Sequence, residues 1–100
     1  MATLKFTRQA LADLDDIRDY TLREWGEQQA RTYVQGIDTK CHAIASGEVR
    51  TRPFPAAPKI SGYCRYEHHY IFFVNTATAT IIIAILHERM SMIERVKDRL

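Results

Sequence analysis

Glycine, proline and cysteine are scarce in this sequence, which has 4 Gly, 3 Pro and 2 Cys among its 100 residues. So few glycines could hardly build the glycine-rich loops that bind nucleotide phosphates, and the chain contains no Walker A, G-x-S-x-G or dinucleotide-binding glycine motif. Cys41 and Cys64 form no C-x-x-C pair, so we expect two reduced cysteines rather than a disulfide or a redox site. We therefore expect no cofactor.

Long apolar segments are also absent. The longest apolar run, Ile81–Leu86, is far shorter than the ~20 residues that a membrane-spanning helix requires, and the first residues lack the apolar core of a signal peptide. We therefore expect a cytoplasmic protein without membrane contacts. The 14 Lys and Arg nearly balance the 12 Asp and Glu, and a net charge of +2 is too small to indicate a nucleic-acid-binding domain.

The histidines form no recognisable metal motif. His87 and Glu88 begin like the H-E-x-x-H motif of zinc proteases, but Ser91 occupies the position of the second histidine. His68 and His69 are adjacent, so in a strand their side chains point to opposite faces and cannot share one metal ion. We therefore expect no metal site.

Two helices are predicted in the first half of the chain. The first is expected to follow the N-cap Thr7 and to end at Gly26. Its predicted apolar stripe consists of Leu11, Leu14, Ile17, Thr21 and Trp25. The second has a stripe spaced by three and four residues from Ala30 to Ala45 and is expected to end at Gly47. A turn at Gly26 would join them as an antiparallel helical hairpin.

Strand patterns dominate the rest of the sequence. Residues 4–7 alternate between apolar and polar, and residues 63–66, 69–74 and 80–86 are rich in aromatic and β-branched side chains. A proline-rich connector precedes these later strands, and the S-x-x-E spacing after residue 90 predicts a capping box that begins a short last helix. The order β-α-α-β-β-β-α predicts one α+β domain over residues 1–100, with an antiparallel sheet packed against the N-terminal hairpin.

The two central strands, at 70–74 and 80–86, are apolar on both faces. An antiparallel sheet with helices on one side usually has a polar opposite face, so this second face needs a cover. Either the short C-terminal helix or a partner protein provides it, and we favour a partner. The candidate contact residues are Tyr70, Phe72, Ile82, Ile93, Val96 and Leu100.

Polar side chains that could cleave RNA gather near the ends of the predicted strands. They are Arg65, Glu67, His69, His87, Glu88 and Arg89. Cleavage by the 2′-hydroxyl needs a general base, a general acid and cations for the developing negative charge, and Arg65 and Arg89 could supply the cations. His87 or Glu67 could transfer the proton. Alternatively, they are ordinary strand-end residues, a reading favoured because no aromatic residue follows Phe73 to stack on a base.

Three segments identify a family resemblance. Tyr20–Gly26 contains an R-x-W-G element, Glu67–Tyr70 enters a predicted strand, and Ile85–Met90 contains an L-H-x-R-M element. Together with the order of elements, they make the chain resemble the RelE/ParE toxin superfamily, most closely the plasmid-type ParE toxins of type II toxin–antitoxin systems. The resemblance implies a toxin that inhibits DNA gyrase and has no catalytic activity of its own.

The resemblance also implies partners and alternatives. ParE toxins are neutralised by a ParD-type antitoxin, which dimerises through a ribbon-helix-helix domain and wraps a C-terminal segment around the toxin. Contact with operator DNA would occur only through that antitoxin. The RelE branch instead cleaves messenger RNA on the ribosome, and on this alternative Arg65, His87 and Arg89 would be catalytic, although the late tyrosine of that branch is missing. A third reading is an inactive member kept as an antitoxin-binding partner.

Overall fold

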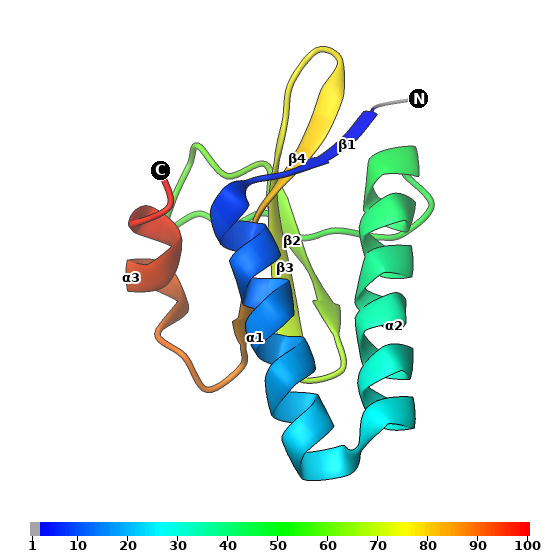
Figure 1. Ribbon diagram of the computed structural model, residues 1–100. Helices are drawn as coiled ribbons and strands as arrows, with labels where there is room; N and C mark the ends of the chain where they lie inside the picture. The colour runs from blue at the N-terminus through cyan, green and yellow to red at the C-terminus, as the bar shows by residue number, and fades with distance from the viewer. Residues whose placement is uncertain (1–2) are drawn as a thin grey trace.

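The computed structural model describes residues 3–100 and has the predicted order of elements (Figure 1). In chain order they are β1 (Thr3–Phe6), α1 (Arg8–Trp25), α2 (Glu27–Ser46), β2 (Gly62–Tyr66), β3 (His69–Asn75), β4 (Ala79–His87) and α3 (Met92–Lys97). The α+β class and the helical hairpin are confirmed. Within the described residues no helix is long and apolar enough to cross a membrane.

The sheet is mixed rather than antiparallel. Its strand order is β1-β4-β3-β2, in which β2, β3 and β4 form an antiparallel meander and β1 pairs with β4 in parallel, with Phe6 opposite Ile82. The prediction of a wholly antiparallel sheet was therefore wrong for the first strand. A strand that reaches its partner through a long helical crossover can run parallel to it, and the sequence of β1 alone does not reveal which neighbour it will have.

Local chemistry sets the ends of the two long helices. The Thr7 hydroxyl accepts a hydrogen bond from the Ala10 N–H at 3.0 Å, which confirms the predicted N-cap. Gly26 (φ 91°) and Gly47 (φ 76°) end the helices in a conformation that glycine adopts without strain. The predicted capping box of the last helix is absent, because Ser91 makes no side-chain cap bond to α3.

The buried stripe of α1 differs from the predicted one. Ala10, Ile17 and Thr21 are buried, whereas Leu11 and Trp25 are 49% and 71% exposed. Ile17 and Thr21 belong to the predicted stripe, and Leu14 packs against the first core cluster, so the prediction was wrong for its two end residues only. Spacing alone did not show that Leu11 and Trp25 lie at the ends of the helix where the core does not reach them.

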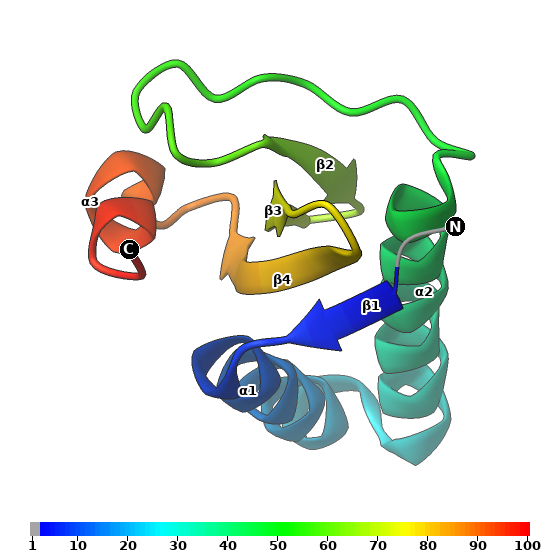
Figure 2. The ribbon, with the colours of Figure 1, turned by 90° about the horizontal axis from the view of Figure 1, so that it is seen from above.

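Two hydrophobic clusters lie on opposite faces of the sheet. The first fills the space between the sheet and helices α1 and α2, and contains Ile37, Cys41 and Ile71. The second lies on the other face, where the connector between α2 and β2 and helix α3 pack (Figure 2). Its buried members are Ala57, Ile60, Phe72, Ile83, Ala84, Leu86 and Val96. The chain itself thus covers much of the face that we expected a partner to cover.

A largely buried ion pair holds the C-terminal segment against the edge of β4. Beyond the end of β1, the Asp13 carboxylate accepts the Ile85 N–H at 2.9 Å and pairs with both Arg99 Nη atoms at 2.9–3.0 Å. The same guanidinium donates to the Ile83 carbonyl at 2.9 Å. The two charged side chains are only 14% and 15% exposed. Asp13 and Arg99 therefore satisfy backbone groups of β4 that β1 is too short to reach.

Both cysteines are free and buried, as expected for reduced residues. Burial raises the pKa of the Cys41 thiol to about 12, with smaller contributions from Asp38 and Cys64. A thiol with so high a pKa carries almost no thiolate at neutral pH, which makes it a poor nucleophile. Cys41 is therefore a core residue.

Candidate functional site

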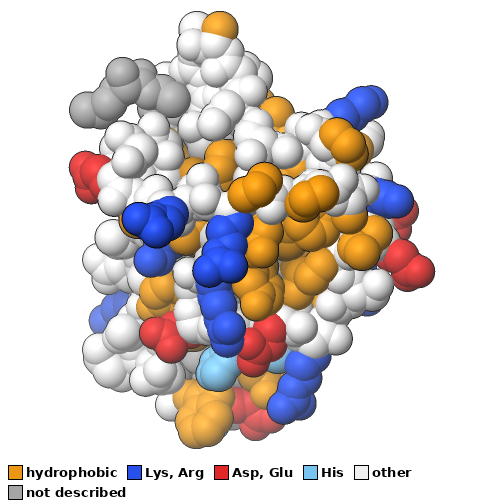
Figure 3. All heavy atoms as spheres, turned by 180° about the vertical axis from the view of Figure 1, so that it is seen from behind, with side chains coloured by type: hydrophobic (Ala, Val, Ile, Leu, Met, Phe, Trp, Pro, Cys, Tyr) orange, Lys and Arg blue, Asp and Glu red, His pale blue; other side chains and the backbone are white. Residues whose placement is uncertain are grey.

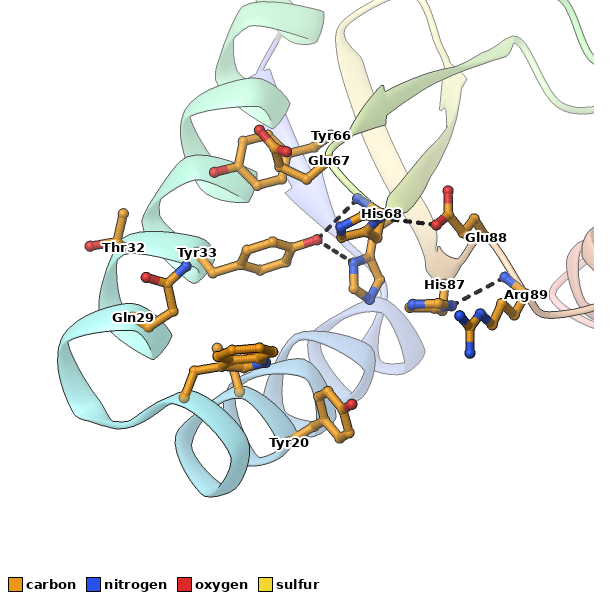
Figure 4. A pocket seen from close by; sticks show the side chains of 13 residues that line it. Tyr20, Gln29, Thr32, Tyr33, Tyr66, Glu67, His68, His87, Glu88 and Arg89 are labelled. Carbon is orange, nitrogen blue, oxygen red and sulfur yellow. Dashed lines mark hydrogen bonds and ion pairs between the residues drawn. The ribbon is translucent and has the colours of Figure 1, made fainter.

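A pocket of about 730 Å³ opens where one end of the sheet faces the helical hairpin (Figure 4). One wall comes from the end of α1 and the start of α2 and includes Tyr20, Trp25 and Tyr33. The other wall comes from the β2–β3 turn and the end of β4, including His87 and Arg89. The strands and helices therefore bring together residues from four separate parts of the chain.

Tyr33 organises the inner part of the pocket. Its hydroxyl lies 2.6 Å from His69 Nδ1 and 3.3 Å from the His68 N–H, which donates to it. Burial lowers the pKa of His69 to about 4, helped by the neighbouring His87 and His68, so the ring is neutral at pH 7. A Tyr33 hydroxyl that accepts from the backbone and donates its proton to Nδ1 leaves the ring proton of His69 on Nε2.

An ion-pair network holds the outer rim of the pocket. The Glu88 carboxylate lies 2.7 Å from Arg65 Nη2 and 3.0 Å from His68 Nδ1, and the hydrogen bond from His68 and the charge of Arg65 lower its pKa. Arg65 also donates to the carbonyl of Glu67 at 2.7 Å and lies over the Tyr70 ring. The side chain of Arg65 is therefore occupied by neighbours on its own sheet.

His87 and Arg89 lie together at the end of β4 (Figure 4). His87 Nδ1 accepts the backbone N–H of Arg89 at 3.1 Å, so a neutral His87 ring carries its proton on Nε2. The ring meets His69 edge-on, with centroids 5.1 Å apart. Arg89 is exposed, and its guanidinium has no hydrogen-bond or ion-pair partner among residues 3–100. It is a cation available to a ligand.

The structure brings only part of the predicted RNA-cleaving group together. His87 and Arg89 line the pocket with Glu67, His69 and Glu88, whereas Arg65 lies outside it and is engaged by Glu88. Sequence reasoning missed the aromatic wall, because no spacing rule connects the end of α1 with the end of β4. Among the described residues no group of three potential ligands could hold a metal ion.

The predicted partner-contact residues have different exposures. Phe72, Ile82 and Val96 are 1%, 0% and 0% exposed, so these three are core residues and offer no surface to a partner. Their burial follows from the connector and α3 on one face and the helical hairpin on the other. Ile93 and Leu100 are 48% and 52% exposed and remain candidates. Tyr70 is half-buried and also remains one.

Lowering the pH from 7 to 4 is expected to destabilise the fold through His69. Its folded pKa of about 4 lies below the ordinary value of 6.5 that the unfolded chain would have, so the unfolded chain gains the proton first as pH falls. The free energy of unfolding should therefore fall by roughly 1–3 kcal/mol across this window, after an allowance for solvent screening. Urea unfolding at a series of pH values measures the slope.

The matched control for that pH profile is His42, whose side chain is 65% exposed on α2. His69→Gln should flatten the profile between pH 4 and 6.5, whereas His42→Gln should leave it unchanged. A profile that keeps its slope in the His69→Gln variant would contradict the assignment of this destabilisation to His69.

Comparison with known proteins identifies the family. A model for the ParE toxin of type II toxin–antitoxin systems, parDE, matches residues 4–92. The chain is 37% identical to Toxin ParE of Escherichia coli over 101 aligned positions, which cover 100% of this chain and 98% of that protein. It is 29% identical to Toxin ParE1 of Caulobacter vibrioides over 91 positions, which cover 91% and 94%.

A solved structure agrees with these sequence matches. A chain of the chromosomal ParDE toxin–antitoxin system from P. aeruginosa superimposes with a TM-score of 0.76 and 26% identity, covering 87% of this chain and 96% of that one. The fold, the sequence relatives and the family model all point to the same group. The chain belongs to the ParE toxin family of type II toxin–antitoxin systems.

Proposed function

We propose that this toxin binds and inhibits DNA gyrase, and that a ParD-type antitoxin with a ribbon-helix-helix domain neutralises it. The observation that carries the proposal is the family match over residues 4–92, with a relative named Toxin ParE aligned along the whole chain. The solved neighbour comes from a ParDE system, which supports an antitoxin as partner. Operator DNA would be contacted only through that antitoxin.

The sheet face opposite the hairpin is the surface that we assign to the antitoxin. Apolar side chains gather in the middle of this face beside a row of basic ones (Figure 3). Tyr63 and Tyr70 pack on the second cluster while staying partly exposed, and Arg65 lies over the Tyr70 ring. An amphipathic segment with acidic residues would complement such a surface, because its apolar side would cover the tyrosines and its carboxylates would face the row of basic side chains (Figure 3).

Inhibition by binding, rather than catalysis, fits the side chains at the end of the sheet. Arg65 is held by Glu88, and the neutral His69 is occupied by Tyr33. A ribonuclease needs a base and an acid free to exchange protons with the substrate. We therefore propose a non-enzymatic toxin. The alternative is RelE-type cleavage of messenger RNA on the ribosome, for which His87 and Arg89 at the pocket are the candidate residues.

The test is a supercoiling assay with purified gyrase. Added toxin should reduce supercoiling and cause cleaved DNA–gyrase complexes to accumulate, and the antitoxin of the same operon should reverse both effects. His87→Ala and Arg65→Ala should retain most of the inhibition, because truncating one interface contact usually costs less than ~1 kcal/mol, or about fivefold in affinity. Replacing the general acid or base of a nuclease would instead lower its cleavage rate about 10²–10⁴-fold.

Two results would contradict the proposal. One is unchanged supercoiling together with codon-specific cuts in ribosome-bound messages, which would establish the RelE-type alternative. The other is a folded, antitoxin-binding His87→Ala or Arg65→Ala variant that no longer kills cells. Circular dichroism and antitoxin co-purification provide the necessary check that each variant is folded.

A further inference from the structure

Two large aromatic side chains on the helical wall of the pocket have no aromatic partner. Trp25 is 71% exposed and Tyr20 54% exposed, and neither stacks on another ring among the described residues. Elsewhere the aromatic side chains pair extensively, as Tyr33 does with Tyr66 and His69. Exposed, unpaired rings in a concave site are suited to stacking on a planar ligand.

The opposite wall presents mainly hydrogen-bond donors. The Arg89 backbone N–H donates to His87 Nδ1, so the ring proton of His87 is on Nε2. With Tyr33 donating to its Nδ1, His69 likewise keeps its ring proton on Nε2. Arg89 adds a guanidinium with no partner in residues 3–100. Tyr20 faces His87 and Arg89 across the opening of the pocket (Figure 4).

The two acidic residues at the pocket do not prevent it from taking an anion. The charge of Glu88 is balanced by Arg65 and by the hydrogen bond from His68. The Glu67 carboxylate lies beside Tyr66, away from His87 and Arg89 (Figure 4). Arg89 is therefore the cation that remains available at the rim, and an anionic group would find both it and the imidazole N–H groups.

We propose that this pocket binds a nucleoside monophosphate unit, with the base stacked on Trp25 and the phosphate held by Arg89 and His87. A planar ring and an anion in one ligand match the two walls, and the pocket of about 730 Å³ lies within the usual range of small-ligand sites, roughly 300–1,000 Å³. A protein carboxylate would use the donors but leave the aromatic wall empty. The ligand could be a free nucleotide or one residue of a single strand.

The chain carries its own reporter for this site, because Trp25 is its single tryptophan. Stacking of a base on the indole should quench its fluorescence. Purified full-length toxin should be titrated with dTMP, with thymidine, with inorganic phosphate, and with 5′-phosphorylated dinucleotides of the deoxy and ribo series. We expect quenching by the phosphorylated nucleotides, weaker binding of thymidine, and no quenching by phosphate alone.

Variants test which side chains hold the ligand. Calorimetry, which does not depend on the indole, should show Trp25→Ala weakening dTMP binding by about five- to a hundredfold, the usual effect of removing a stacked aromatic ring. Arg89→Ala should weaken it by about tenfold or more, the usual effect of losing a hydrogen bond to a charged group. Arg95→Ala is the matched control, since Arg95 is an exposed arginine on α3 outside the pocket, and binding should not change.

Each result of these titrations either supports or overturns the nucleotide site. Tighter binding of the deoxy or of the ribo dinucleotide supports the site and identifies the natural source as DNA or RNA. The proposal is overturned if millimolar dTMP leaves the fluorescence unchanged, if phosphate binds as well as dTMP, or if both pocket variants bind like the wild type. Because the assay contains no gyrase, its result is independent of whether the toxin inhibits that enzyme.

Discussion

A chain that ends at Ser91 is expected to lose most of its free energy of unfolding. The truncation removes Val96, which is 0% exposed in the second cluster, and burying such a side chain contributes ~1.5–3 kcal/mol. It also removes Arg99 and leaves the Asp13 carboxylate without its charge partner, which typically costs ~3–5 kcal/mol. The sum approaches the ~5–15 kcal/mol stability of a whole domain.

Urea unfolding followed by far-UV circular dichroism measures this loss. The matched control is the full-length Ile93→Ala and Leu100→Ala double variant, because both side chains are about half exposed and should change stability little. A truncated chain that unfolds cooperatively at the wild-type urea midpoint would show that α3 contributes nothing to the fold. A partner protein would then be the expected cover of the second sheet face.

Asp13→Ala is expected to destabilise the fold strongly. It breaks both bonds to Arg99 and leaves the Ile85 N–H without its acceptor, so we expect a loss of about 3–5 kcal/mol. For a domain of this size, each kcal/mol lowers the melting temperature by about 4–8 °C. Thermal unfolding measures the melting temperature of Asp13→Ala. Asp16→Ala is the control and should change the melting temperature little, since Asp16 is exposed on the same helix.

A double-mutant cycle distinguishes the ion pair from general damage. Arg99→Met keeps the length of the side chain and removes the charge, so adding it to Asp13→Ala should cost less than the sum of the single effects. Coupling of about 1–3 kcal/mol is typical of residues in direct contact. Strict additivity would mean that the pair does not hold the C-terminus to β4.

The sequence alone determined the elements and the family. The ends of the two long helices were predicted correctly from Thr7, Gly26 and Gly47. Helix capping depends only on residues within one or two turns of the helix end, so the local sequence is enough to predict it. The three later strands were predicted from short runs of aromatic and β-branched residues, which are also local features of the sequence. The R-x-W-G and L-H-x-R-M elements pointed to the ParE toxins because they are short and continuous, and the family match confirmed that assignment.

Only the tertiary structure decided how these elements meet. β1 pairs with β4 across a distance in sequence that no local pattern encodes, which made the sheet mixed. The connector and α3 cover the second face of the sheet, so Phe72 and Val96 became core residues instead of contact residues. The pocket likewise joins Trp25 to Arg89, two residues that spacing rules treat as unrelated. Side-chain spacing reports which face of an element is apolar, whereas the identity of its neighbour depends on long-range packing.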